Sequence, residues 1–213
     1  MSATLRHGSR AAKRIGLVMA AAGLLIVGCH ASQPLGPPTP TGATILGGST
    51  MASTPAPPPG WNVHVVTPES QQQAQETVLG YLRKTLSALP PGTVIDGSRY
   101  GSAGSTAPCE DKPHSQTELF SSVGDLKPPE GTDPAHLVGQ IGDIWKSWGW
   151  WVFERDGTYK PNRSGYSPDG YELQVAVPAV PGPPSIIGNS PCFPRELVRE
   201  DLPFPTKIAA GDS

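Results

Sequence analysis

Few residues in this sequence have the types and spacing of a catalytic or metal-binding site. Glu110, Asp111 and His114 lie close together, and two carboxylates with an imidazole are able to bind a metal ion. Their spacing matches no strong ligand motif, so we expect no metal and no cofactor. The sequence also lacks the G-x-S-x-G of hydrolases, the phosphate-binding P-loop and the H-E-x-x-H of zinc enzymes. No motif in the sequence indicates a particular reaction. A catalytic site assembled from residues far apart in the sequence is left as an alternative.

A group of aromatic residues is the most unusual local feature. Trp145 and Trp148 recur at helical spacing, which favours a place in the core. Trp150 and Trp151 are neighbours on a predicted strand and must point to opposite faces, so we expect one of them to be less buried. An exposed aromatic surface suits a sugar, lipid or protein partner. The residues of this possible binding surface are Trp150, Trp151, Tyr159 and Tyr171.

The amino-terminal segment predicts export. Four basic residues and no acidic one precede an uncharged apolar run over residues 15–28. At 1.5 Å per residue the run is about 21 Å long as a helix, which is shorter than a bilayer core of about 30 Å. A basic start followed by a short apolar run is typical of a signal peptide. We therefore expect residues 1–28 to be removed.

The end of the apolar run indicates the kind of signal. Ile26, Val27, Gly28 and Cys29 resemble the lipobox of bacterial lipoproteins, with Ile26 where that family most often has Leu. In that family the cysteine thiol receives a diacylglyceryl group, the chain is cut just before it, and the new amino terminus is acylated. Two or three acyl chains are needed for lasting membrane attachment. The resemblance implies that Cys29 is lipidated and holds the chain to a membrane.

The other two cysteines form a natural pair. If Cys29 carries lipid, Cys109 and Cys192 remain, and export places them in an oxidising compartment where a disulfide is expected. Two free buried thiols are the alternative. The spacing is not C-x-x-C, so a thioredoxin-like role has no support.

A tether separates the lipid site from the folded part. Residues 30–60 contain eight Pro and no Lys, Arg, Asp or Glu, a composition that cannot bury enough apolar surface to fold. With Cys29 they form the second of three segments, 29–60, ahead of a globular domain over 61–213. Whether the Thr and Pro residues of the tether are glycosylated stays open. After removal of the signal the chain has 12 basic and 18 acidic residues, a balance that gives no basic surface for nucleic acid.

The domain's pattern predicts a mixed fold. Apolar residues recur at helical spacing over 69–89, with Thr67 as cap and Pro68 at the first helical position. Asp133 and Pro134 begin a second helix in the same way, and Gly149 ends it. Strands are expected over 93–100, 116–123, 150–155, 171–177 and 186–192, with a hairpin turn at Asp156 and Gly157 that leads into a partner at 158–159, and with a loosely ordered tail after residue 194. We therefore predict an α+β fold with an antiparallel sheet of about five strands and two helices packed on one face.

Together these features resemble a known group. The lipobox, the Thr/Pro tether, the Trp-rich second helix and the runs at residues 167–173 and 190–192 resemble the small Lpp-type lipoproteins of mycobacteria. That group is largely without assigned activity, so the resemblance implies a cell-envelope location and no catalytic residues.

The sequence favours a non-catalytic binding or interaction domain on the outer face of the cytoplasmic membrane. Its partners are expected to be the membrane, through lipid on Cys29, and an envelope protein, glycan or lipid. An envelope hydrolase whose site is not visible in the sequence and a lipid or glycolipid carrier are the alternatives. The sequence excludes no oligomeric state.

Overall fold

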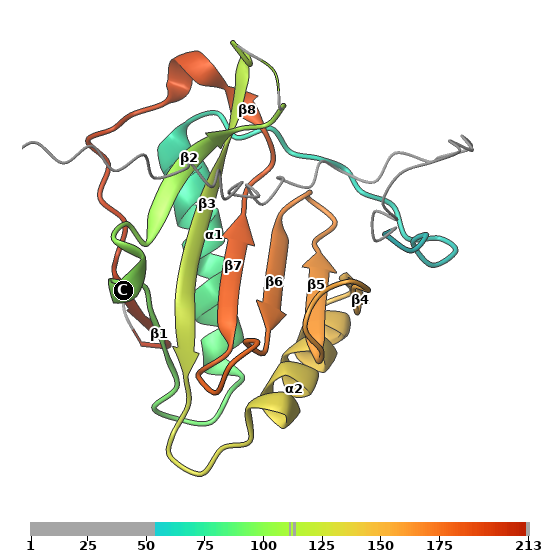
Figure 1. Ribbon diagram of the computed structural model, residues 1–213. Helices are drawn as coiled ribbons and strands as arrows, with labels where there is room; N and C mark the ends of the chain where they lie inside the picture. Colours follow the sequence, from blue (N-terminus) through green and yellow to red (C-terminus); the bar gives the residue numbers. More distant parts are fainter. Residues whose placement is uncertain (1–53, 111, 113, 212–213) are drawn as a thin grey trace, which may run out of the picture. The chain divides into compact units, whose positions relative to one another are not determined.

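The computed structural model describes residues 54–110, 112 and 114–211 of the chain. The predicted signal peptide, Cys29, the tether up to residue 53 and Asp111 lie outside the described residues. The described part has two α-helices and one antiparallel sheet of nine strands (Figure 1). The elements are α1 (Gln71–Ser87), β1 (Val94–Asp96), β2 (Gly104–Pro108), β3 (Thr117–Lys127), α2 (Pro134–Ser147), β4 (Trp151–Phe153), β5 (Asn162–Tyr166), β6 (Glu172–Ala176), β7 (Ser185–Asn189), β8 (Phe193–Pro194) and β9 (Lys207–Ala209).

The sheet is built around its longest strand, β3. The strands follow the order β4-β5-β6-β7-β3-β1-β9, and β2 and β8 also pair with β3. One half of β3 pairs with β2 and the other half with β1, so both neighbours share the same side of the strand. This arrangement places β4 at one end of the sheet and β9 at the other.

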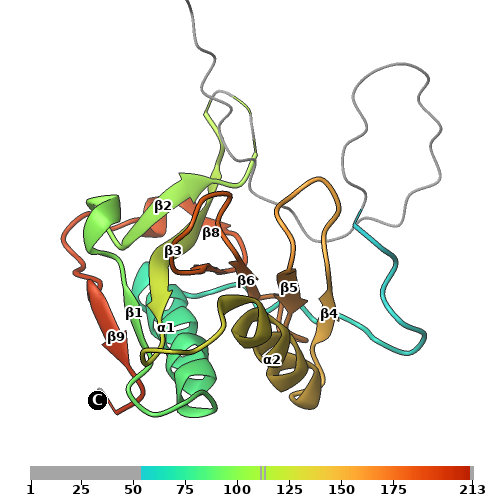
Figure 2. The ribbon, with the colours of Figure 1, turned by 60° about the horizontal axis from the view of Figure 1, so that its bottom comes forward.

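Both helices cover the same face of the sheet, as Figure 2 shows. Helix α1 buries Val78, Leu82 and Leu86, and α2 buries Ile141 and Trp145, each with at most 2% of its surface exposed. Small residues on the strands permit this close packing: a side-chain carbon built on Gly188 would lie 2.8 Å from Val78 Cγ1. The predicted α+β class with two helices on one face is confirmed, and the opposite face, which we call the open face, is covered by neither α-helix of the described residues.

The helix boundaries confirm one prediction and correct another. Asp133 caps α2, because its carboxylate accepts hydrogen bonds from the backbone N–H groups of Ala135 and His136 at 3.2 and 3.1 Å. Helix α1, however, begins at Gln71 with Ser70 as cap, and the predicted start at Thr67 is wrong. The preceding segment is extended because His64 N–H and Val66 N–H donate to the carbonyls of Pro168 and Asp169 at 2.7 and 3.0 Å.

The predicted strand count of about five is too low. Strand β2 lies in a Gly- and Ser-rich stretch that reads as a loop, and β9 lies in the tail that was expected to be loosely ordered. The tail is held by packing: Phe204 contacts Phe120 with ring centroids 5.0 Å apart, and β9 pairs with β1. The partner of β4 also differs from the prediction, since β4 pairs with β5 after a longer loop rather than with residues 158–159.

The expected disulfide is present. Cys109 and Cys192 are bonded, with Cα atoms 6.1 Å apart and a sequence separation of 83. The bond connects the residue after β2 to the residue before β8, so it ties together two strands that both pair with β3. The amino-terminal half of β3 is therefore flanked by two covalently linked strands.

Candidate functional site: the open face of the sheet

Strand register sets ten side chains on the open face in two adjacent rows. The rows cross β3, β7, β6, β5 and β4, and the residues that alternate with them along the strands, such as Leu173 and Phe120, point into the helix-covered core. We call these ten residues the cross-strand strip. Its first row is Ser121, Asn189, Glu172, Tyr166 and Trp151, and its second row is Val123, Ile187, Gln174, Ser164 and Phe153.

A buried carboxylate lies at the centre of the strip. The side chain of Glu172 is 4% exposed, and its Oε1 accepts hydrogen bonds from Arg155 Nη2 at 2.7 Å and from Gln174 Nε2 at 2.9 Å. Its Oε2 accepts a longer bond from Asn189 Nδ2 at 3.4 Å. The three donors are planar side chains that are all partly exposed. Glu172 therefore fixes the orientation of three groups that a molecule on the open face would meet first.

Arg155 reaches the strip from the loop that follows β4. Both of its backbone groups are held by the buried side chain of Asn162, whose Oδ1 accepts from Arg155 N–H at 2.8 Å and whose Nδ2 donates to the Arg155 carbonyl at 3.0 Å. The guanidinium also donates to the hydroxyl of Tyr166 at 3.1 Å. Its Nε is buried and has no hydrogen-bond partner. The loop is thus built to place one guanidinium over the sheet.

Burial dominates the electrostatics of this cluster. Desolvation raises the pKa of the Glu172 carboxyl, against the opposing effects of the Arg155 charge and of hydrogen bonds from Tyr166, Asn189 and Gln174. Desolvation, followed by the nearby Glu172 carboxylate, raises the pKa of the Tyr166 phenol. The arginine and the carboxylate compensate each other's charge, so the cluster offers oriented hydrogen-bonding groups rather than a net charge.

One end of the strip is aromatic. Trp151 stacks on Tyr166 with ring centroids 5.3 Å apart and contacts Phe153 at 4.8 Å. Trp61, from the segment before α1, lies on Trp151 at 5.4 Å, and its indole Nε1 is buried without a partner. Trp61 and Phe153 are the half-buried members of this group, and Trp151 and Tyr166 lie beneath them.

The aromatic surface expected from the sequence is corrected by these positions. Trp150 and Trp151 do point to opposite faces, but both are buried, at 6% and 4% exposure. Trp150 and Tyr171 lie in the core under the helices, where both contact the ring of Tyr81 at 4.8 and 5.7 Å. Only Tyr159, at 61% exposure in the β4–β5 loop, is freely accessible. The expectation failed because α1 covers Trp150 and the distant Trp61 covers Trp151, and strand alternation carries no information on either.

Of the acidic and histidine residues after Cys109, Glu110 and His114 show no shared site, and Asp111 lies outside the described residues. Glu110 pairs with Lys112 at 3.0 Å, and both side chains are more than half exposed. His114 has a positive φ of 64°, and its carbonyl accepts a hydrogen bond from Gln116 Nε2 at 2.9 Å. Within the residues that the structure describes, no three His, Cys, Asp or Glu side chains gather as metal ligands would.

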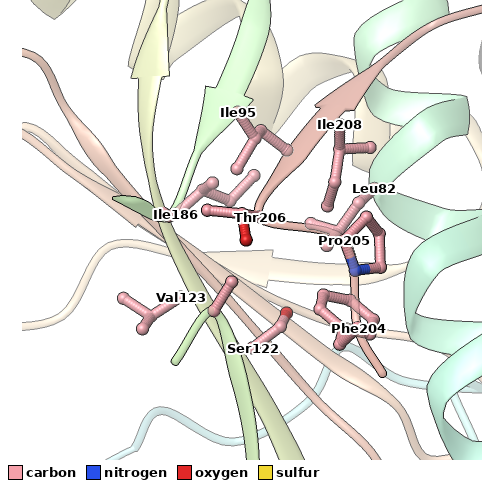
Figure 3. Close-up of a pocket in the computed structure, with 12 residues that line it drawn as sticks. Leu82, Ile95, Ser122, Val123, Ile186, Phe204, Pro205, Thr206 and Ile208 are labelled. Atoms are coloured by element: carbon pink, nitrogen blue, oxygen red, sulfur yellow. The ribbon is translucent and has the colours of Figure 1, made fainter. Parts of the chain in front are cut away.

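A small enclosed cavity lies between the sheet and α1, beneath the carboxyl-terminal segment. Its lining includes Leu82, Ile95, Ile186, Phe204 and Ile208, which Figure 3 shows facing one another. Its volume of about 10 Å³ is the space that a single water molecule needs. An acyl chain does not fit there. No helix in the described part of the chain is long and apolar enough to span a bilayer.

In comparisons with known proteins, no protein-family model, no curated protein and no solved structure matches this chain. The residues of the site therefore carry the functional argument alone. Sequence reasoning missed Glu172, Arg155, Asn162, Gln174 and Asn189 as site residues. The one available signal was the pair of polar residues at alternate positions of β6, which reads as an ordinary solvent-facing row.

Proposed function

We propose that this chain is a lipid-anchored lipoprotein of the cell envelope, held to the outer face of the cytoplasmic membrane through Cys29. The lipobox supports this proposal from the sequence. The disulfide supports it independently, because such bonds persist in oxidising compartments, and it leaves Cys29 as the cysteine outside the pair.

The folded domain acts in this proposal as a non-catalytic binding module that uses its open face. One observation carries the idea: a single buried carboxylate, Glu172, orients the half-buried side chains of Arg155, Gln174 and Asn189. Since both carboxylate oxygens are occupied by donors, Glu172 serves as a support and not as a free base. A rigid first layer held by a buried second layer is the arrangement that specific recognition needs.

The carrier and hydrolase alternatives gain less support. The enclosed cavity beneath the carboxyl-terminal segment holds about one water molecule, which gives a lipid carrier no room there. No particular contact in the described residues favours a hydrolase over a binding module.

Metabolic acyl labelling tests the anchor. The full chain, expressed in a mycobacterial host with a labelled fatty acid, is expected to carry label and to sediment with membranes. Cys29→Ala is expected to lose both properties, because the thiol is the acceptor. The control is the double variant Cys109→Ser, Cys192→Ser, which lacks the disulfide and should retain the label. Label that persists in Cys29→Ala would contradict the proposal.

A further inference from the structure

We propose that the cross-strand strip binds an uncharged glycan chain laid across the strands. This inference rests on the binding role proposed above and adds the chemical class of the ligand. Three features of the strip support it: the kind of hydrogen-bonding groups it presents, the aromatic rings at one end, and its length.

The hydrogen-bonding groups of the strip match hydroxyls. Gln174 and Asn189 each use amide N–H groups to bind Glu172, which leaves their carbonyl oxygens as acceptors beside the remaining N–H donors. A hydroxyl both donates and accepts, so a row of mixed donors and acceptors is complementary to a polyhydroxylated molecule. Because Glu172 compensates the charge of Arg155 at 2.7 Å, an anionic ligand gains no net attraction. The chemistry therefore favours a neutral ligand.

The aromatic end supplies the second element of sugar recognition. The rings of Trp61 and Phe153 are half-buried, and sugar rings stack their C–H faces on such surfaces while their hydroxyls point outward. Three buried side-chain N–H groups in the described residues have no partner, and two of them, Trp61 Nε1 and Arg155 Nε, belong to this end of the strip. An unpaired buried donor is costly, and sugar oxygens are able to satisfy it.

Trp61, which lies beside the strip, is also able to move without disrupting the strand pairing of the sheet. It belongs to the segment before α1, which is joined to the turn after β5 by two backbone hydrogen bonds, at His64 and Val66. A small displacement of Trp61 would expose Trp151 and the indole Nε1 of Trp61 itself while β4 stays paired with β5.

The length of the strip favours a chain over a single sugar. Five adjacent strands are spaced by about 4.8 Å, so the rows extend for roughly 19 Å from Trp151 to Ser121. An oligosaccharide laid across the strands would meet aromatic rings first, then Arg155, Gln174 and Asn189, and then the half-buried Ile187 and Val123.

Calorimetric titration of the acylated full chain in detergent tests the inference. The probes are maltohexaose, mannohexaose, xylohexaose and chitohexaose, together with a peptidoglycan stem peptide. We expect at least one hexasaccharide to bind, and its affinity to be unchanged between low and high salt, because no net charge is involved. Gln174→Ala and Asn189→Ala should each weaken it by about three- to tenfold through one lost polar contact. Near-ultraviolet circular dichroism confirms that each variant is folded.

Gln140→Ala is the matched control, since Gln140 is a half-buried glutamine on α2, away from the open face, and should leave affinity unchanged. Failure of every hexasaccharide to bind would overturn the inference, as would affinity that falls steeply with salt. Binding of the stem peptide alone, weakened by Gln174→Ala, would reject the glycan and keep the open face as the binding site. Glycan binding lost in Gln140→Ala but retained in both open-face variants would reject the open face as well, while acyl labelling reports on the anchor separately.

Discussion

Two clusters on the open face contain the same three kinds of side chain in different surroundings. Near β1, Arg99 contacts Asp125 at 2.8 Å and Tyr100 donates to the same carboxylate at 3.0 Å. At the other end, Arg155 contacts Glu172 at 2.7 Å and donates to Tyr166. The bond lengths are alike and both carboxylates are buried, with Asp125 at 7% and Glu172 at 4% exposure, but the Arg99 side chain is 60% exposed and the Arg155 side chain only 16%.

This difference in exposure decides what each cluster is able to do. Water reaches the Arg99 guanidinium and screens its attraction to Asp125, so the loss of Arg99 removes a weaker interaction. At the Arg155 pair the guanidinium as well as the carboxylate has lost most of its water, so both depend on protein partners and their geometry is fixed. The same chemistry thus links the segment after β1 to β3 in one place and orients a set of side chains in the other.

The largest expected effect is the loss of one buried partner. Arg155→Ala leaves Glu172 buried and unpaired, which is expected to lower the free energy of unfolding at neutral pH by about 3–5 kcal/mol. Arg99→Ala is the matched change at the exposed cluster and should lower it far less. Urea denaturation of both variants measures the two effects.

A double substitution separates loss of the pair from loss of packing. Arg155→Met combined with Glu172→Leu removes both charges and should recover most of the stability lost in Arg155→Ala, because no charge remains buried. Equal losses in Arg155→Ala and Arg99→Ala would remove the distinction between the clusters.

The pH dependence of stability is expected to have opposite signs in the two regions. Burial raises the folded-state pKa of Glu172, so between the unfolded pKa near 4.3 and the folded value the native state holds a proton that the unfolded state has released. Its contribution is complete below this window and is lost as the pH rises through it. Beside the exposed cluster, the Lys127 ammonium and a hydrogen bond from Ser98 lower the pKa of Asp96, so its contribution is lost as the pH falls.

Replacing each carboxyl group by its neutral amide tests these opposite pH dependences of stability. The stability of Glu172→Gln relative to the wild type should increase with rising pH, by up to about 1.4 kcal/mol for each pH unit of the window. The stability of Asp96→Asn relative to the wild type should instead decrease as the pH rises from strongly acid values. Chemical denaturation across the acid to neutral range measures both slopes, and parallel slopes would show that the two carboxyl groups do not differ as described.

The sequence predicts the helix-covered half of the molecule better than the open face. Apolar spacing placed both helices, Asp133 and Gly149 marked the ends of α2, and cysteine counting gave the Cys109–Cys192 bond. These signals are local or have few alternatives. The strands β2 and β9 were missed because Gly104 and the tail around Ile208 take their structure from distant partners, Phe120 and β1.

The candidate site could not be predicted for the same reason. Glu172 reads as an outward residue of an alternating strand, and its burial depends on Arg155 and on neighbouring strands that pairing brings together. Trp151 reads as accessible until Trp61, 90 residues earlier, covers it. Site residues here are defined by register across five strands, and a single sequence does not contain that register.

The smallest expected effect is that of a single hydroxyl group. Tyr166→Phe removes the acceptor of one Arg155 N–H at 3.1 Å together with the hydrogen bond from Tyr166 to Glu172, and it leaves the stacked ring in place, so it should lower the free energy of unfolding by about 0.5–1.5 kcal/mol. It should also loosen the Arg155 guanidinium and weaken any ligand of the strip by a similar factor. Tyr100→Phe removes the matching hydroxyl beside Asp125, which keeps two hydrogen bonds from Arg99, and should change stability little. Urea denaturation and titration with the bound hexasaccharide measure both variants. If Tyr100→Phe proved the more costly change, solvent exposure would not be the property that separates the two clusters, and the backbone position of Tyr100 next to Arg99 would have to be considered instead.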